Sequence, residues 1–134
     1  MRSGTQVIKD VTQKFFMEHR LSIAEHSYLQ ELLPFEIQKP LTLDEYIELF
    51  NEVASFYTGE LANLIKKYLL FNDLFCKDNA RIIKEGLMLF RRFFHYLLQE
   101  IKTMQLQDST LNRLQYVVLK VDKYLKKFSP HLGI

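Results

Sequence analysis

Three basic side chains interrupt the most apolar stretch of the chain, and their chemistry is that of a binding site. Arg91, Arg92 and His95 lie close together in sequence. A planar guanidinium binds carboxylates or phosphates through paired hydrogen bonds, and an imidazole changes charge near neutral pH. The simpler interpretation is a narrow polar stripe, with the arginine stems covering aromatic neighbours. The alternative, which we take as the candidate site, is an anion or partner site in a helical groove. The residues expected to form it are Arg91, Arg92, Phe93, Phe94, His95 and Leu97.

The histidines are poorly spaced for a metal ion. Helical bundles hold di-iron sites with a Glu three residues before each His, and no histidine of this chain has one. His19 and His26 could share a helix face, but seven residues of helix rise about 10.5 Å. Both rings could not then reach one ion with bonds of about 2 Å. We expect no metal site and no cofactor.

Signatures of catalysis are equally scarce. Glycine occurs only at positions 4, 59, 86 and 133, so neither a phosphate-binding loop nor a dinucleotide fingerprint nor a nucleophile elbow can be formed. Cys76 has no base beside it in sequence. Glu45, Glu48 and Glu52 follow the spacing of a solvated helix face. We expect no catalytic residues, and we expect that the protein is not an enzyme.

Charge and composition limit the partners and the compartment. A net charge of +2 is too small to indicate nucleic acid or a membrane surface. The N-terminal residues are polar, which indicates no signal peptide, and no apolar run approaches the roughly 20 residues that span a bilayer. A single cysteine cannot form an internal disulfide and favours a reducing compartment. We expect a cytoplasmic protein without a membrane or nucleic-acid partner.

Helical spacing of apolar residues predicts five helical stretches in a single domain spanning 1–134. Residues 5–33 form one helix or two, because a capping box begins at Ser22. A second capping box at Thr42 begins a helix that Gly59 would end. Helices over 60–74, 79–104 and 109–128 follow. Few glycines and prolines mean long elements and short turns, so the expected fold is all-α, an antiparallel four- to five-helix up-and-down bundle.

Gly59 also permits a second interpretation of its surroundings. Two predicted helices meet there, as in a helix-turn-helix, and lysines follow at positions 66 and 67. The junction leaves almost no room for a turn, and the second helix offers few side chains for base edges. We therefore favour two ordinary bundle helices over a DNA-reading unit.

The last two helices carry more apolar surface than a minimal bundle needs. Residues 79–104 are apolar on nearly all sides, which places this helix at the bundle centre or at the seam of an oligomer. The final helix has a heptad pattern of apolar residues. Its members are Leu111, Leu114, Val118, Val121, Leu125 and Phe128.

These surfaces lead to a prediction of function. We expect a non-enzymatic protein-interaction module, an adaptor, regulator or chaperone-like binder, that acts through an apolar helical surface and forms a homodimer. The alternative is a helical sensor domain that binds a small apolar or acidic ligand in a pocket lined by the phenylalanines of the fourth helix.

Overall fold

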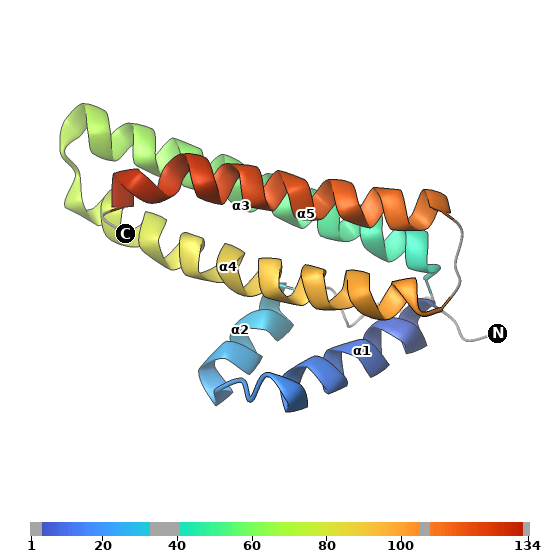
Figure 1. Ribbon diagram of the computed structural model, residues 1–134. Helices are drawn as coiled ribbons and strands as arrows, with labels where there is room; N and C mark the ends of the chain where they lie inside the picture. The colour runs from blue at the N-terminus through green and yellow to red at the C-terminus, as the bar shows by residue number, and fades with distance from the viewer. Residues whose placement is uncertain (1–3, 33–40, 105–107, 133–134) are drawn as a thin grey trace.

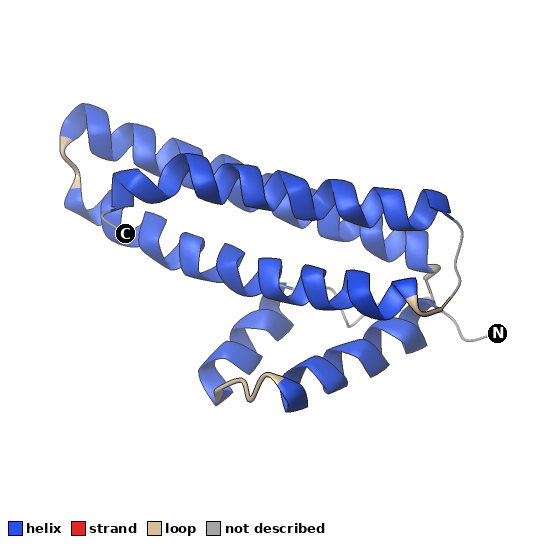
Figure 2. Ribbon diagram, viewed as in Figure 1, coloured by secondary structure: helices blue, strands red, loops and turns tan. Residues whose placement is uncertain are grey.

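The computed structural model describes residues 4–32, 41–104 and 108–132, and nearly all of them are helical. No strand occurs within these ranges (Figure 2). The predicted all-α bundle is therefore confirmed. The helices are α1 (Gly4–Glu18), α2 (Ile23–Leu32), α3 (Leu43–Phe71), α4 (Leu74–Lys102) and α5 (Asp108–Phe128), followed by the 3-10 turn η1 (Ser129–Leu132).

Three long helices form the body of the molecule. α4 runs antiparallel to α3, and α5 returns antiparallel to α4, so α3 and α5 point the same way (Figure 1). α1 packs on α3 and α4, and α2 packs on α4. An ion pair between Lys14 and Glu100 joins α1 to the C-terminal end of α4. A second ion pair, between Glu25 and Arg92, joins α2 to α4 nearer its middle. The α3–α4 connection lies at the opposite end, beyond α1 and α2 (Figure 1).

The N-terminal stretch is two helices, which answers the question that the sequence left open. α1 ends at Glu18, and Arg20 takes a left-handed backbone conformation with φ of 48°. The Ser22 hydroxyl accepts a hydrogen bond from the Glu25 N–H, and the Glu25 carboxylate accepts one from the Ser22 N–H, both at 3.1 Å. This reciprocal cap begins α2 as predicted.

α1 approaches the start of α3 closely. A Cβ atom at Gly4 would overlap the backbone of Thr42 and Leu43, so only glycine fits there. The Thr5 hydroxyl oxygen next to it accepts hydrogen bonds from the Leu41 N–H at 3.1 Å and from the Tyr46 hydroxyl at 3.2 Å. The first turn of α1 is thus fixed against the cap of α3.

α3 is one continuous helix, and the prediction that it ends at Gly59 is wrong. Its N-terminal capping box at Thr42 is confirmed. The buried positions Ala54, Thr58, Leu61 and Ile65 then follow helical spacing across Gly59 without a change of register. Unbroken register allows the helix to continue, at a cost of about 1 kcal/mol for an interior glycine. Because no turn exists between residues 54 and 65, the helix-turn-helix interpretation is excluded.

The turn between α3 and α4 contains only Asn72 and Asp73. Asn72 ends α3 in the left-handed conformation, with φ of 53°, and its N–H donates to the Tyr68 carbonyl. The Asp73 carboxylate accepts from the N–H groups of Phe75 and Cys76 at 3.0 and 3.3 Å. α4 therefore begins at Leu74, five residues earlier than the predicted start at 79, because Asp73 is a complete N-cap.

The core is built around α4. Phe90 and Phe94 stack at 5.5 Å, with their rings 5° from parallel. Phe50 of α3 lies 5.5 Å from Phe94, and Phe15 of α1 meets Phe93 edge-on at 5.5 Å. α4 contacts α1, α2, α3 and α5, so its apolar character on nearly all sides is explained by a central position within one chain.

The heptad of α5 is also used inside this chain. Leu114, Val118, Val121, Leu125 and Phe128 are buried, and Leu111 packs against the same core. These residues face α3 and α4, which are the helices that α5 contacts most. Both patterns that favoured an oligomer seam are thus accounted for by packing within a single bundle.

Candidate interaction surfaces

The basic residues singled out in the sequence are tied to carboxylates on neighbouring helices. The Arg91 Nε lies 2.5 Å from one oxygen of Asp122 on α5, and the His95 Nε2 lies 3.4 Å from the other. Arg92 reaches Glu25 of α2 at 3.5 Å. All three side chains are about half exposed, so they form the polar stripe of α4 and connect it to α5 and α2.

These three residues nevertheless share a groove. It has a volume of about 510 Å³ and runs between the end of α1 and the outer face of α4. Tyr96 lies on its floor, where its hydroxyl donates to Glu18 at 2.8 Å. Burial, followed by this hydrogen bond, raises the pKa of Tyr96. The groove is lined by His19, Met88, Arg91, Arg92, His95, Tyr96 and Gln99.

The apolar members of the predicted site lie elsewhere. Phe93, Phe94 and Leu97 have no exposed surface and belong to the core between α1, α3 and α4. A partner could not touch them without opening the bundle. The structure therefore separates the six predicted residues into an exposed basic set and a buried apolar set.

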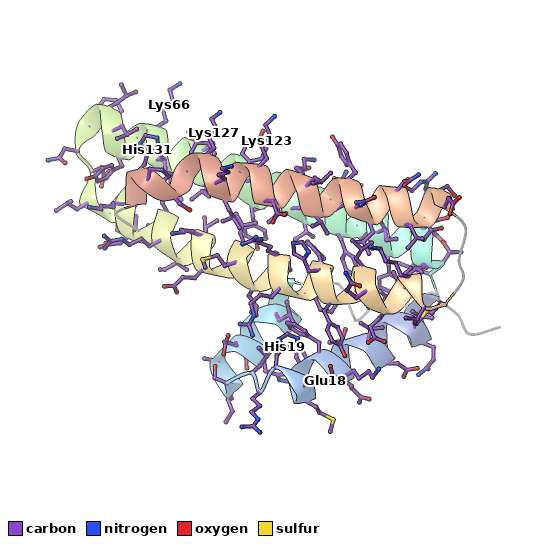
Figure 3. All side chains as sticks on the ribbon, viewed as in Figure 1. Glu18, His19, Lys66, Lys123, Lys127 and His131 are labelled. Atoms are coloured by element: carbon purple, nitrogen blue, oxygen red, sulfur yellow. The ribbon has the colours of Figure 1, made fainter. Side chains whose placement is uncertain are left out.

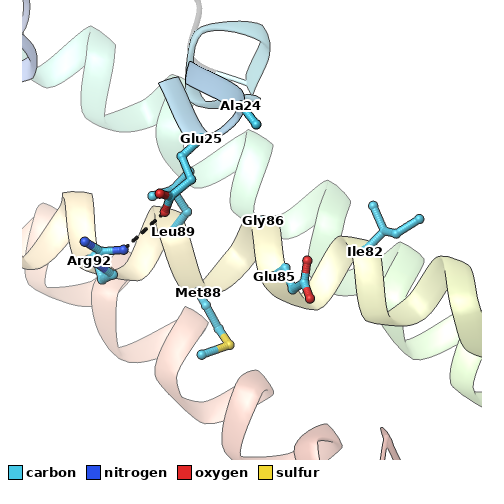
Figure 4. Close-up of a pocket in the computed structure, with 8 residues that line it drawn as sticks. All are labelled: Ala24, Glu25, Ile82, Glu85, Gly86, Met88, Leu89 and Arg92. Atoms are coloured by element: carbon cyan, nitrogen blue, oxygen red, sulfur yellow. Dashed lines mark hydrogen bonds and ion pairs between the residues drawn. The ribbon is translucent and has the colours of Figure 1, made fainter. Parts of the chain in front are cut away.

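A second groove separates α2 from α4. Its volume is about 500 Å³, and the Arg92–Glu25 ion pair closes one end (Figure 4). Ile82 and Met88, both exposed, supply its apolar wall. The lining residues are Ala24, Glu25, Ile82, Glu85, Gly86, Met88, Leu89 and Arg92.

Exposed apolar side chains gather at the α3–α4 turn, and we call this surface the hairpin tip. It contains five side chains on both sides of the Asn72–Asp73 turn. Their exposed fractions are 56% for Leu69, 65% for Leu70, 75% for Phe71, 63% for Leu74 and 75% for Phe75. Contiguous exposed apolar surface of this kind marks interaction sites.

Sequence reasoning missed the hairpin tip. Leu69 continues the helical spacing of the buried Leu61 and Ile65, yet it is exposed because α3 extends beyond the helices that could cover it (Figure 1). The signal available was local: apolar pairs stand directly on each side of Asn72–Asp73, where a tight turn must project them past the bundle. Spacing alone does not tell a covered stripe from an uncovered one.

A smaller groove of about 300 Å³ adjoins the hairpin tip, between α3 and η1. Leu69 and Leu70 belong to both features, so the groove continues the apolar surface of the tip. Lys66 and His131, which are labelled in Figure 3, also line it. The remaining lining residues are Ala62, Ile65 and Phe128.

Two buried groups with reactive side chains, Cys76 and Lys84, lie on α4. Cys76 is buried in the first turn of α4, where burial and the Asp73 carboxylate raise the pKa of its thiol. Lys84 is 2% exposed, and burial lowers the pKa of its ammonium group. A raised thiol pKa disfavours the thiolate that a nucleophile needs.

Comparisons with family models, with curated proteins and with solved structures found no match. Among the residues that the structure describes, no three His, Cys, Asp or Glu side chains are grouped so as to hold one metal ion. No helix in the described ranges has both the length and the apolar character that crossing a bilayer requires.

Proposed function

We propose that this protein is a non-enzymatic protein-interaction module that docks through the hairpin tip. The supporting observation is the exposure of five large apolar side chains within seven residues, at one end of the three-helix body. Burying a leucine or phenylalanine contributes about 1.5–3 kcal/mol, so a partner that covers these side chains gains substantial free energy. Phe71 and Phe75 are each 75% exposed, so a partner that covers them would bury most of their apolar surface.

The proposal moves the docking surface away from the one expected in the sequence. That surface was the middle of α4 with Phe93, Phe94 and Leu97, all of which are buried. The hairpin tip is the beginning of the same helix and the end of α3. The adaptor, regulator or chaperone-like role remains a proposal, now attached to this end of the molecule.

Site-directed photocrosslinking tests the proposal. A photoreactive phenylalanine analogue is placed at Phe75, and a matched control carries it at Met17, which is 79% exposed on α1. Mass spectrometry identifies the products formed in cell extract. We expect one saturable product from position 75 that the unmodified protein competes away and that the double substitution Leu70→Ser, Phe71→Ser abolishes. Identical product patterns from both positions would refute the proposal.

Self-association is tested separately by light scattering over a wide concentration range. The homodimer expected in the sequence would appear as a doubled mass. If the hairpin tip forms it, Phe71→Ser returns the mass to that of one chain. If Phe71→Ser leaves a dimer intact, the tip is not the dimer surface.

A second candidate function is favoured by the groove that brings Arg91, Arg92 and His95 together with His19. Their charge and the aromatic floor at Tyr96 suit a small acidic ligand, which is the sensor alternative. Native mass spectrometry of freshly purified protein tests it. A bound mass that Arg92→Gln removes supports the sensor, and a clean spectrum of the chain alone counts against it.

A further inference from the structure

We infer that the occupant of the hairpin tip is an acidic amphipathic helix of a partner protein. Its apolar face would pack on the tip and in the adjoining groove, and its carboxylates would meet a row of lysines on α3 and α5. This inference rests on the proposed function and adds the chemistry of the partner. Two observations support it together. Lysines without an ion pair to any described residue lie on α3 and α5, and they lie beside the exposed apolar side chains of the hairpin tip.

The charge of the molecule is concentrated at this end. Residues 60–81 and 120–131 carry eight Lys or Arg and four Asp or Glu, an excess of four, whereas the whole chain has a net charge of +2. The remainder of the chain is therefore net negative. Of the four acidic residues, Asp73 caps α4 and Asp122 is paired with Arg91 and His95. Glu60 and Asp78 are exposed and form no ion pair in the described parts of the chain.

Five lysines at this end form no ion pair within the described residues. Lys66, Lys67, Lys123, Lys126 and Lys127 are exposed, and none forms a salt bridge within the described ranges. Lys9, Arg20 and Lys102 elsewhere are also exposed without a salt bridge to a described residue, so this end differs in how many unpaired lysines it gathers. Five such lysines on α3 and α5 together produce a positive potential that attracts a negatively charged partner.

The lysines form a row beside the groove. Lys123 and Lys127 are one helical turn apart on α5, with a rise of about 6 Å. Figure 3 shows both at the same end of the bundle as Lys66 of α3 and His131 of η1. Lys66 and His131 also line the groove that contains Leu69 and Leu70. Carboxylates one turn apart on a partner helix would match the spacing of Lys123 and Lys127, while its apolar residues enter the groove.

The same geometry favours a helix over an anionic lipid surface. A flat bilayer would contact the extreme end of the tip, but the lysine row extends backward along the side of α5. The groove of about 300 Å³ is concave and suits an inserted side chain. An elongated partner that lies along the bundle uses the row, the groove and the tip together.

Two synthetic peptides test the inference on the full chain. Both are amphipathic helices of about five turns with the same apolar face. One carries Glu beside that face and the other carries Lys. Fluorescence anisotropy measures binding at low salt and at an ionic strength of ~0.15 M. We expect the acidic peptide to bind at least about tenfold more tightly than the basic one, with the advantage shrinking as salt rises.

Substitutions locate the binding. The double variant Lys66→Glu, Lys127→Glu should weaken the acidic peptide about tenfold. The control Lys9→Glu, Lys102→Glu makes the same change of net charge at exposed sites outside the row and should leave binding within about twofold. The variant Leu70→Ser, Phe71→Ser should abolish binding of the acidic peptide. Circular dichroism confirms that each variant is folded.

Each alternative occupant gives its own result. Equal binding of both peptides, lost with Leu70→Ser, Phe71→Ser, overturns the acidic partner but leaves apolar docking at the tip intact. Binding of neither peptide overturns the inference. Sedimentation with phosphatidylserine vesicles that depends on Phe71 identifies a lipid surface instead, and a Phe71-dependent dimer identifies a second copy. A Phe75 photocrosslink that persists while the peptides fail separates this inference from the proposed function.

Discussion

Replacing Gly59 with alanine tests the continuity of α3 through the sign of a stability change. Gly59 is exposed in the middle of the helix, and a Cβ atom built there would meet nothing within 4 Å. The added methyl group therefore meets no clash, and the substitution removes the conformational entropy that an interior glycine loses on folding. Host–guest helix propensities give a gain of about 1 kcal/mol.

The alternative structure predicts the opposite sign. If Gly59 ended a helix in the left-handed conformation, alanine would strain the backbone and lower stability by about 1 kcal/mol. The two outcomes thus differ by about 2 kcal/mol. For a chain of 134 residues, the expected gain corresponds to a rise in Tm of roughly 3 °C.

Urea denaturation followed by circular dichroism measures the change. We expect Gly59→Ala to raise the midpoint and leave the slope unchanged. Gly4→Ala is the matched control, because its methyl group would overlap the backbone of Thr42 and Leu43 and must lower the midpoint. A midpoint below that of the parent protein for Gly59→Ala would show that α3 does not pass continuously through this residue.

Three further perturbations test the caps and the buried polar groups. Thr42→Ala should cost about 1 kcal/mol in urea denaturation and Thr42→Ser much less, because the hydroxyl cap is lost only in the first; equal losses would contradict this. Lys84→Met should raise stability at neutral pH, since burial lowers the pKa of Lys84 in the folded state. The unfolded chain then binds more protons, so the stability of the parent protein rises as pH increases toward 10.5 and the advantage of Lys84→Met shrinks; a gap independent of pH would contradict a depressed pKa. The thiol of Cys76 should react with iodoacetamide far more slowly in the folded protein than in urea, because it is buried and its pKa is raised; similar rates would show an open thiol.

The starts of α2 and α3 could be predicted from the sequence because their signals are local, whereas the Asp73 cap that begins α4 was missed. The capping boxes at Ser22 and Thr42 are each contained within four residues, and both form as expected. Helix ends were harder to predict, because Gly and Asn both commonly end helices and the chain offers Gly59 and Asn72 as candidates. Only Asn72 takes the left-handed conformation. The difference lies in the buried stripe, which continues past Gly59 to Ile65, whereas residues 69–75 around Asn72 are all exposed.

The candidate site could be predicted only in part, because burial and pairing depend on distant residues. Arg91 and His95 were recognised as exceptional, but their partner Asp122 lies on another helix. Leu69 has the same spacing as the buried Leu61 and Ile65, yet no other helix covers it. Position along the bundle decides this difference, and spacing within one helix carries no information about it.

The hairpin tip and the first turn of α1 lie at opposite ends of α3, so the length of α3 sets the distance between them. α1 and α2 thicken one end, while the hairpin tip projects from the other (Figure 1). α3 contains 29 residues, so it separates the two ends by about 40 Å. A protein held at the tip would stand that distance from the first turn of α1, with the continuous helix α3 between them.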